Sequence, residues 1–83
     1  YTIPKNLNEQ IFYESVEANP LQGEKLHGMN NDPNFSKALG FQKMKAIYKP
    51  DVGQAIEIHY QYNENTKKVY DMKFIEKKLN RNI

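Results

Sequence analysis

Two segments decide the fold: Ala55-Ile56-Glu57-Ile58-His59-Tyr60-Gln61-Tyr62 and Lys68-Val69-Tyr70-Asp71-Met72-Lys73-Phe74-Ile75-Glu76, joined by Asn63-Glu64-Asn65-Thr66-Lys67. In both segments apolar and polar side chains alternate, which is typical of β-strands with one buried face. The short polar link between them is typical of a tight connection. The sequence therefore predicts a β-hairpin that buries one face and exposes the other.

Matching apolar with apolar positions predicts how the strands pair. With Tyr62 opposite Lys68, the expected core pairs are Tyr60 with Tyr70, Ile58 with Met72 and Ile56 with Phe74, and the polar pairs are Glu57 with Lys73 and His59 with Asp71. Through the turn at 50–54, the preceding strand would pair Met44 with Tyr60, Ala46 with Ile58, Tyr48 with Ile56 and Lys45 with His59. We therefore expect Lys45, His59 and Asp71 in one row across three strands, on the polar face.

The elements before the hairpin are predicted to be helical. Residues 5–18 have apolar side chains at near-helical spacing, and Asn19-Pro20 ends that helix; the apolar positions are Leu7, Ile11, Phe12 and Val16. Residues 33–39 have Asp32 as an N-cap and Gly40 beyond their end, which is typical of a short helix. Phe35 and Leu39 would face the core.

The expected fold class is α+β. The amino-terminal helices would pack on one face of a three- to four-stranded antiparallel sheet, with strands at about 41–49, 55–62 and 68–76. The 83 residues make a single domain with one small core. The chain has no cysteine and no apolar run long enough for a membrane span, so we expect a soluble domain. Its first residue is Tyr1, which is consistent with a domain excised from a longer chain.

Charge is unevenly distributed along the chain. Residues 1–40 carry three lysines and five acidic groups, whereas residues 41–83 carry nine basic and five acidic groups. The strand half is therefore basic, which weakly favours an anionic ligand over the sheet. The competing interpretation is a soluble surface whose exposed lysines keep edge strands from aggregating.

The predicted polar row has a usable chemistry. Asp71 would orient the ring of His59 and favour its protonated form, and Lys45 could bind an anionic group beside it. A second histidine, His27, lies between Gly23 and Gly28 with Lys25 nearby, in an irregular segment at 21–31 that is long for a chain of this size. Catalytic candidates are therefore His27, His59 and Asp71, and substrate-binding candidates are Lys25, Lys45 and Lys73.

Each candidate also has a purely structural interpretation. In that interpretation the row is three exposed residues that pair across a sheet, and His27 caps a turn. Four tyrosines have the chemistry to stack on nucleic-acid bases, but their predicted inward orientation favours core packing: Tyr13, Tyr60, Tyr62 and Tyr70. The His, Asp and Glu spacing does not match a metal site, and we expect no metal and no cofactor.

The order of elements and the polar face resemble the small bacterial ribonuclease toxin domains grouped with barnase, colicin-type tRNases and RelE toxins. The segment Leu21-Gln22-Gly23-Glu24-Lys25-Leu26-His27-Gly28, followed by a short helix, is also similar to carboxyl-terminal modules of contact-dependent and polymorphic toxins. This resemblance implies metal-independent RNA cleavage on the exposed sheet face and a cognate immunity protein that blocks it. It also implies delivery as part of a secreted toxin into the cytoplasm of a target cell.

The sequence thus predicts an endoribonuclease toxin domain, monomeric when free, that cleaves tRNA or another structured RNA by 2′-hydroxyl transesterification. The alternative is a non-catalytic protein-binding module, such as an immunity or inhibitor protein, or an adaptor that adds its exposed strand to a partner. A nucleic-acid binder without catalysis is a third possibility, recognisable by salt-dependent binding without products.

Overall fold

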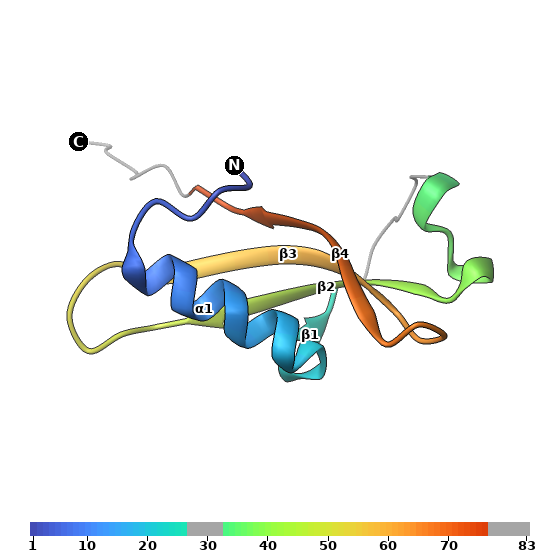
Figure 1. Ribbon diagram of the computed structural model, residues 1–83, viewed down its shortest axis with the longest axis horizontal. Helices are drawn as coiled ribbons and strands as arrows, with labels where there is room; N and C mark the ends of the chain where they lie inside the picture. Colours follow the sequence, from blue (N-terminus) through green and yellow to red (C-terminus); the bar gives the residue numbers. More distant parts are fainter. Residues whose placement is uncertain (27–32, 77–83) are drawn as a thin grey trace.

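The computed structural model describes residues 1–26 and 33–76, and confirms the α+β fold class. One α-helix, α1 (Leu7–Ala18), lies against a four-stranded antiparallel sheet in the order β1-β2-β3-β4 (Figure 1). The strands are β1 (Glu24–Lys25), β2 (Phe41–Tyr48), β3 (Ile56–Asn63) and β4 (Lys68–Phe74). Three short 3₁₀ turns complete the described elements: η1 (Pro20–Gln22), η2 (Pro33–Phe35) and η3 (Lys37–Leu39).

Helix α1 begins later and turns a different face to the sheet than its spacing predicts. Asn6 is the N-cap, and its side chain accepts a hydrogen bond from the backbone N–H of Glu9 at 2.9 Å. The buried positions are Glu9, Phe12 and Val16, whereas Leu7 and Ile11, expected in the core, are 69 % and 56 % exposed. Glu9 is held inward because its carboxylate accepts hydrogen bonds from the Tyr1 hydroxyl and the Lys5 backbone N–H.

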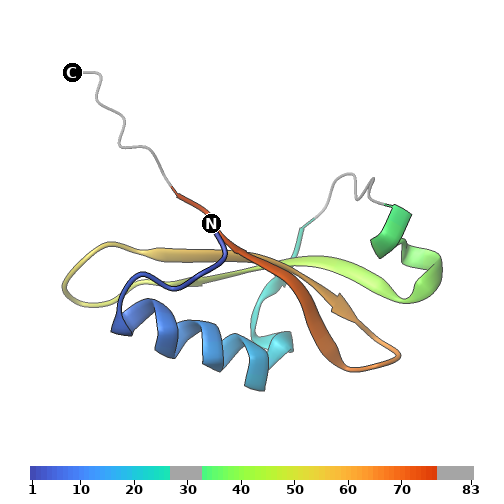
Figure 2. The same ribbon diagram turned by 45° about the horizontal axis from the view of Figure 1, so that its top comes forward.

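The helix predicted at 33–39 is two separate 3₁₀ turns, η2 and η3. Gly40 follows with φ of 96°, the left-handed conformation expected of a residue just past a helix end. The predicted N-cap, Asp32, lies outside the described residues. Figure 2 shows α1 on one side of the sheet and the turns at one of its ends. Phe35 packs edge-on against Phe41, and Leu39 is exposed, so this segment does not cover the core as expected.

The pairing of β2 with β3 is the predicted one. Met44 lies opposite Tyr60, Ala46 opposite Ile58, Tyr48 opposite Ile56 and Lys45 opposite His59. Every side chain of this pair therefore lies on the face that the alternation predicts. β1 adds a short fourth strand along the outer edge of β2, with Glu24 opposite Lys45.

The predicted pairing of β3 with β4 is wrong, in two steps. At the turn, Asn63 rather than Tyr62 lies opposite Lys68, because the Asn63 side chain accepts hydrogen bonds from the backbone N–H groups of Asn65 and Thr66 and extends the strand. Further along, an extra residue in β4 forms a bulge at Asp71, whose φ is 54°. Ile58 consequently lies opposite Phe74, and His59 opposite Lys73.

These two offsets explain which side chains of β4 lie on the predicted face of the sheet and which do not. Beyond the bulge the total offset is two residues, so Met72 and Phe74 still face the core. Between the turn and the bulge it is one residue, which reverses the faces. Val69 therefore packs against the core, and Tyr70 lies on the opposite face, against the prediction for both.

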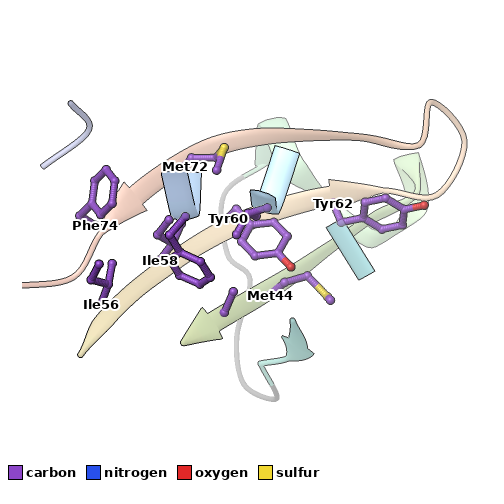
Figure 3. Close-up of a cluster of buried hydrophobic side chains, with 10 residues drawn as sticks. Met44, Ile56, Ile58, Tyr60, Tyr62, Met72 and Phe74 are labelled. Carbon is purple, nitrogen blue, oxygen red and sulfur yellow. The ribbon is translucent and has the colours of Figure 1, made fainter. Parts of the chain in front are cut away.

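The core lies between α1 and the sheet. Figure 3 shows its side chains gathered on one side of β2, β3 and β4. The buried apolar residues are Phe12, Val16, Met44, Ala46, Ile56, Ile58, Tyr60, Tyr62, Met72 and Phe74. The Tyr60 hydroxyl donates a hydrogen bond to the backbone oxygen of Pro20 and lies against Gly23, where the chain passes so close to β2 that a side chain would meet Tyr60 and the Lys45 backbone oxygen.

Candidate active site

The face of the sheet turned away from α1, here called the open face, carries the candidate chemistry. The register assigns to it Phe41, Lys43, Lys45, Ile47, Glu57, His59, Gln61, Asn63, Lys68, Tyr70 and Lys73. No described helix covers this face in the way that α1 covers the other (Figure 2). Polar and basic side chains therefore stand together on a surface built on rigid strands, which fixes their spacing.

A row of three basic side chains crosses the centre of the open face. His59 of β3 lies directly between Lys45 of β2 and Lys73 of β4, and Glu24 of β1 extends the row beyond Lys45. We call Lys45, His59 and Lys73 the central row. Adjacent strands lie about 4.8 Å apart, so each lysine can reach an anion bound over the histidine.

The partner of His59 is Glu57 and not Asp71. The Nε2 atom of His59 is 2.6 Å from Oε2 of Glu57, two residues back on the same strand. Both side chains are partly shielded from solvent, with 25 % and 12 % exposed. A carboxylate at this distance orients the ring and leaves Nδ1 as the nitrogen available to a ligand.

Asp71 does not lie in the predicted row, since it occupies the bulge of β4. Its carboxylate is 3.5 Å from Nζ of Lys73, so it contacts the neighbouring lysine in place of the histidine. The predicted pair His59–Asp71 is therefore replaced by His59–Lys73 across the strands. The row contains two cations around the imidazole where one cation and one carboxylate were expected.

The remaining predicted residues are not brought to the central row. Lys25 pairs with Met44, which places it on the same side of the sheet as the core and opposite to the open face. His27 lies outside the described residues. Of the six predicted site residues, the structure therefore brings together Lys45, His59 and Lys73, with Asp71 beside Lys73.

Glu57 is the functional candidate that sequence reasoning missed. It was expected on the polar face, but as a partner of Lys73. The signal was present, because residues two apart on a strand point to the same side, and Glu57-Ile58-His59 has that spacing. The apolar and polar alternation predicts pairs across strands and does not reveal this local one.

Both lysines of the central row have a carboxylate nearby. Lys45 Nζ is 3.5 Å from Oε1 of Glu24, and Lys73 Nζ is 3.5 Å from Asp71. Both contacts are partly exposed, and exposed ion pairs contribute at most about 1 kcal/mol. A phosphate group placed between the lysines can therefore replace these partners at little cost.

The shape of the surface limits the kind of ligand. A hollow of about 520 Å³ lies at the end of β3 and β4, lined among others by Tyr1, Lys5, Glu9 and Glu57. Neither His59 nor the lysines of the central row line it. The side chains of Lys45, His59 and Lys73 are 30 %, 25 % and 55 % exposed on a face formed by strands, which suits a macromolecule better than an enclosed small molecule.

Within residues 1–26 and 33–76, no group of three or more His, Asp or Glu side chains is arranged to hold a metal ion. In the same part of the chain, no helix combines the length and apolarity needed to cross a membrane.

Comparison with protein-family models, with curated proteins and with solved structures finds no match to this chain. The resemblance to ribonuclease toxin domains therefore stays a prediction.

Proposed function

We propose that this domain is a metal-independent endoribonuclease that cleaves RNA on the open face, with His59 at its centre. The observation that carries the proposal is the placement of His59, bonded to Glu57 at 2.6 Å, between two lysines from the neighbouring strands. An imidazole that exchanges protons, beside cations that bind phosphate, is what cleavage through the 2′-hydroxyl requires.

The proposed reaction needs two proton transfers, one from the RNA and one to it. A base removes the 2′-hydroxyl proton, and the 2′-oxygen attacks the adjacent phosphorus. The bond from phosphorus to the 5′-oxygen breaks, and an acid protonates that oxygen. The products are a 2′,3′-cyclic phosphate and a 5′-hydroxyl, and no further reactant is consumed.

The residues of the central row divide these tasks. His59 transfers a proton, and Glu57 holds its ring in place. Lys45 and Lys73 hold the phosphate and stabilise the negative charge that develops on its oxygens. His27 remains the candidate for the second proton transfer. Asp71 now has a different proposed role, which is to position Lys73 at 3.5 Å.

The test is incubation of the purified domain with total tRNA in EDTA, followed by analysis of the RNA ends. Wild type is expected to yield 2′,3′-cyclic phosphate and 5′-hydroxyl ends. His59→Ala is expected to slow cleavage about 10²- to 10⁴-fold, the usual contribution of a general acid or base. Glu57→Gln is expected to slow it less, since the ring remains in place.

Controls separate catalysis from charge and folding. Lys45→Ala and Lys73→Ala should weaken RNA binding, while Lys49→Ala, which removes a lysine beyond the end of β2, should not. His27→Ala tests the second candidate. Absence of cleavage by wild type, or full cleavage by the variant that lacks both histidines, would contradict the proposal.

The wider setting follows the resemblance to ribonuclease toxins. We propose that tRNA or another structured RNA is the substrate and that a cognate immunity protein covers the open face. The domain would act in the cytoplasm of a target cell after delivery by a secreted toxin, as a monomer. Growth arrest on induction, relieved by His59→Ala, is the expected cellular result.

A second candidate function is favoured by the outer side of α1. Leu7 and Ile11 are one turn apart and largely exposed, and the exposed Glu14 and Glu17 lie on the same helix. An apolar and acidic helix surface suits a non-catalytic protein-binding module with a basic partner. High expression without toxicity, together with intact RNA in the cleavage assay, would select this function over the nuclease.

A further inference from the structure

Three aromatic rings form a connected group at one end of the open face. Phe41 of β2 and Tyr70 of β4 meet edge to face with centroids 5.4 Å apart, and Phe35 of η2 meets Phe41 at 5.1 Å. All three are half-buried. These rings have no part in the proposed proton transfers.

The geometry fixes these rings firmly. Phe41 and Tyr70 come from the two strands that flank β3, whose backbones are about 9.6 Å apart, so both rings lean over β3 to meet. Gln61, which lies between these strands on the same face, is only 4 % exposed as a result. The Tyr70 hydroxyl is also 2.9 Å from Oγ1 of Thr66 in the turn. A ring held in this way loses little freedom when a ligand binds.

The rings adjoin the central row. Tyr70 and Lys43 both pair with Gln61, two residues along β3 from His59. Two strand residues span about 7 Å, so a group held by the central row is within reach of the Tyr70 ring. Of the tyrosines considered for stacking, Tyr60 and Tyr62 are buried in the core, and Tyr13 packs against Phe74. Tyr70 is the one that shares the face of His59.

We propose that Tyr70, backed by Phe41, is a stacking site for the nucleobase next to the phosphate held by the central row. This inference rests on the proposed function and specifies its substrate, which must present an unpaired base at the cleavage position. Stacking on an aromatic ring accepts any base, because every base has a π-face. Substrate choice would then depend on a single-stranded segment more than on one base.

The experiment measures binding of a short 2′-O-methyl RNA, which cannot be cleaved, at one fixed salt concentration. Single positions of the RNA are replaced in turn by an abasic ribose. Tyr70→Ala is expected to weaken binding of the intact RNA about tenfold to a hundredfold. The abasic substitution at one position should cause a similar loss, and the two losses should not add.

Matched variants separate stacking from folding. Tyr70→Phe keeps the ring and should bind like wild type, whereas Tyr70→Leu keeps apolar bulk without a ring and should bind like Tyr70→Ala. Tyr48→Ala removes an exposed tyrosine from the opposite face and should leave RNA binding unchanged. Thermal unfolding of each variant checks that the sheet is intact.

The outcomes distinguish the two proposals. Additive losses at every RNA position, or wild-type binding by Tyr70→Leu, would overturn the stacking site even if RNA is cleaved. Non-additive losses with no cleavage of unmodified RNA would support the stacking site and overturn the nuclease.

Discussion

The two faces of the sheet differ in what their side chains do, although they alternate residue by residue along the same strands. Ile58 is fully buried under α1, while His59 beside it lies on the open face with Glu57 as its partner. The face under α1 supplies the apolar burial that holds the domain together. The open face carries the central row, whose charged and polar side chains keep part of their surface exposed to solvent. Adjacent substitutions should therefore have unlike effects.

The largest expected contrast on stability is between these two neighbours. Ile58→Ala removes a side chain with no solvent exposure and should lower the free energy of unfolding by about 2 to 5 kcal/mol. His59→Ala removes a side chain that is 25 % exposed, together with its contact to Glu57, and should cost about 0.5 to 1.5 kcal/mol. Urea denaturation of both variants measures the difference. Equal losses would show that the open face is also a packing face.

A smaller effect is expected from one buried hydroxyl. Tyr60→Phe removes the hydrogen bond to the backbone oxygen of Pro20, which links η1 to the central strand. Losing this partly buried hydrogen bond should cost about 0.5 to 1.5 kcal/mol. Tyr62→Phe is the control, because its ring is similarly buried in the same strand. A Tyr60→Phe protein as stable as wild type would mean that the link contributes nothing.

Raising the pH above 10 should lower the free energy of unfolding by a smaller amount than the preceding substitutions. Burial, the hydrogen bond to Glu9 and the charges of Glu9 and Glu76 raise the pKa of Tyr1 to about 12. Burial also raises the pKa of Tyr60, although a backbone hydrogen bond from Gly23 lowers it in part. Both folded-state pKa values are raised, so this stability is fully present below pH 10, the pKa of an unfolded tyrosine.

That contribution is lost as the pH rises from 10 through about 12, because the unfolded chain then ionises first. Tyr1 is 39 % exposed, which keeps its contribution to this loss of stability modest. Denaturation midpoints measured between pH 8 and 12 test this, and Tyr1→Phe should reduce the decline. A midpoint that stays level through pH 12 would contradict it.

The smallest expected effect concerns the bulge. Deleting Asp71 removes the extra residue, so that Tyr70 still pairs with Gln61 and Met72 lies directly opposite Tyr60. Every remaining side chain keeps its face, and relief of the left-handed backbone at Asp71 offsets the lost twist. Stability should change by about 1 kcal/mol or less. Deleting Met72 instead should be the more harmful change, because Asp71 would then lie opposite Tyr60 on the core face.

Alternation predicted the fold class and the β2–β3 register because both strands of that pair are regular over their whole length. It failed for β3–β4 because the side-chain cap of Asn63 and the bulge at Asp71 each add an offset that no apolar pattern records. It also misjudged the face of α1, where two hydrogen bonds draw the carboxylate of Glu9 inward. Part of the candidate site was predicted from the sequence. Lys45 of β2 lies beside His59 of β3 as predicted, but the carboxylate that contacts His59 belongs to Glu57 and not to Asp71.

Gly23 lies against residues of both faces of the sheet. Its backbone lies close to the Tyr60 hydroxyl, which belongs to the core side, and to the main-chain oxygen of Lys45, whose side chain belongs to the open face. A methyl group there would push the Lys45 peptide outward and shift the amine relative to the imidazole. We expect a mutation at Gly23 both to loosen the interior around Tyr60 and to displace Lys45 from its place beside His59.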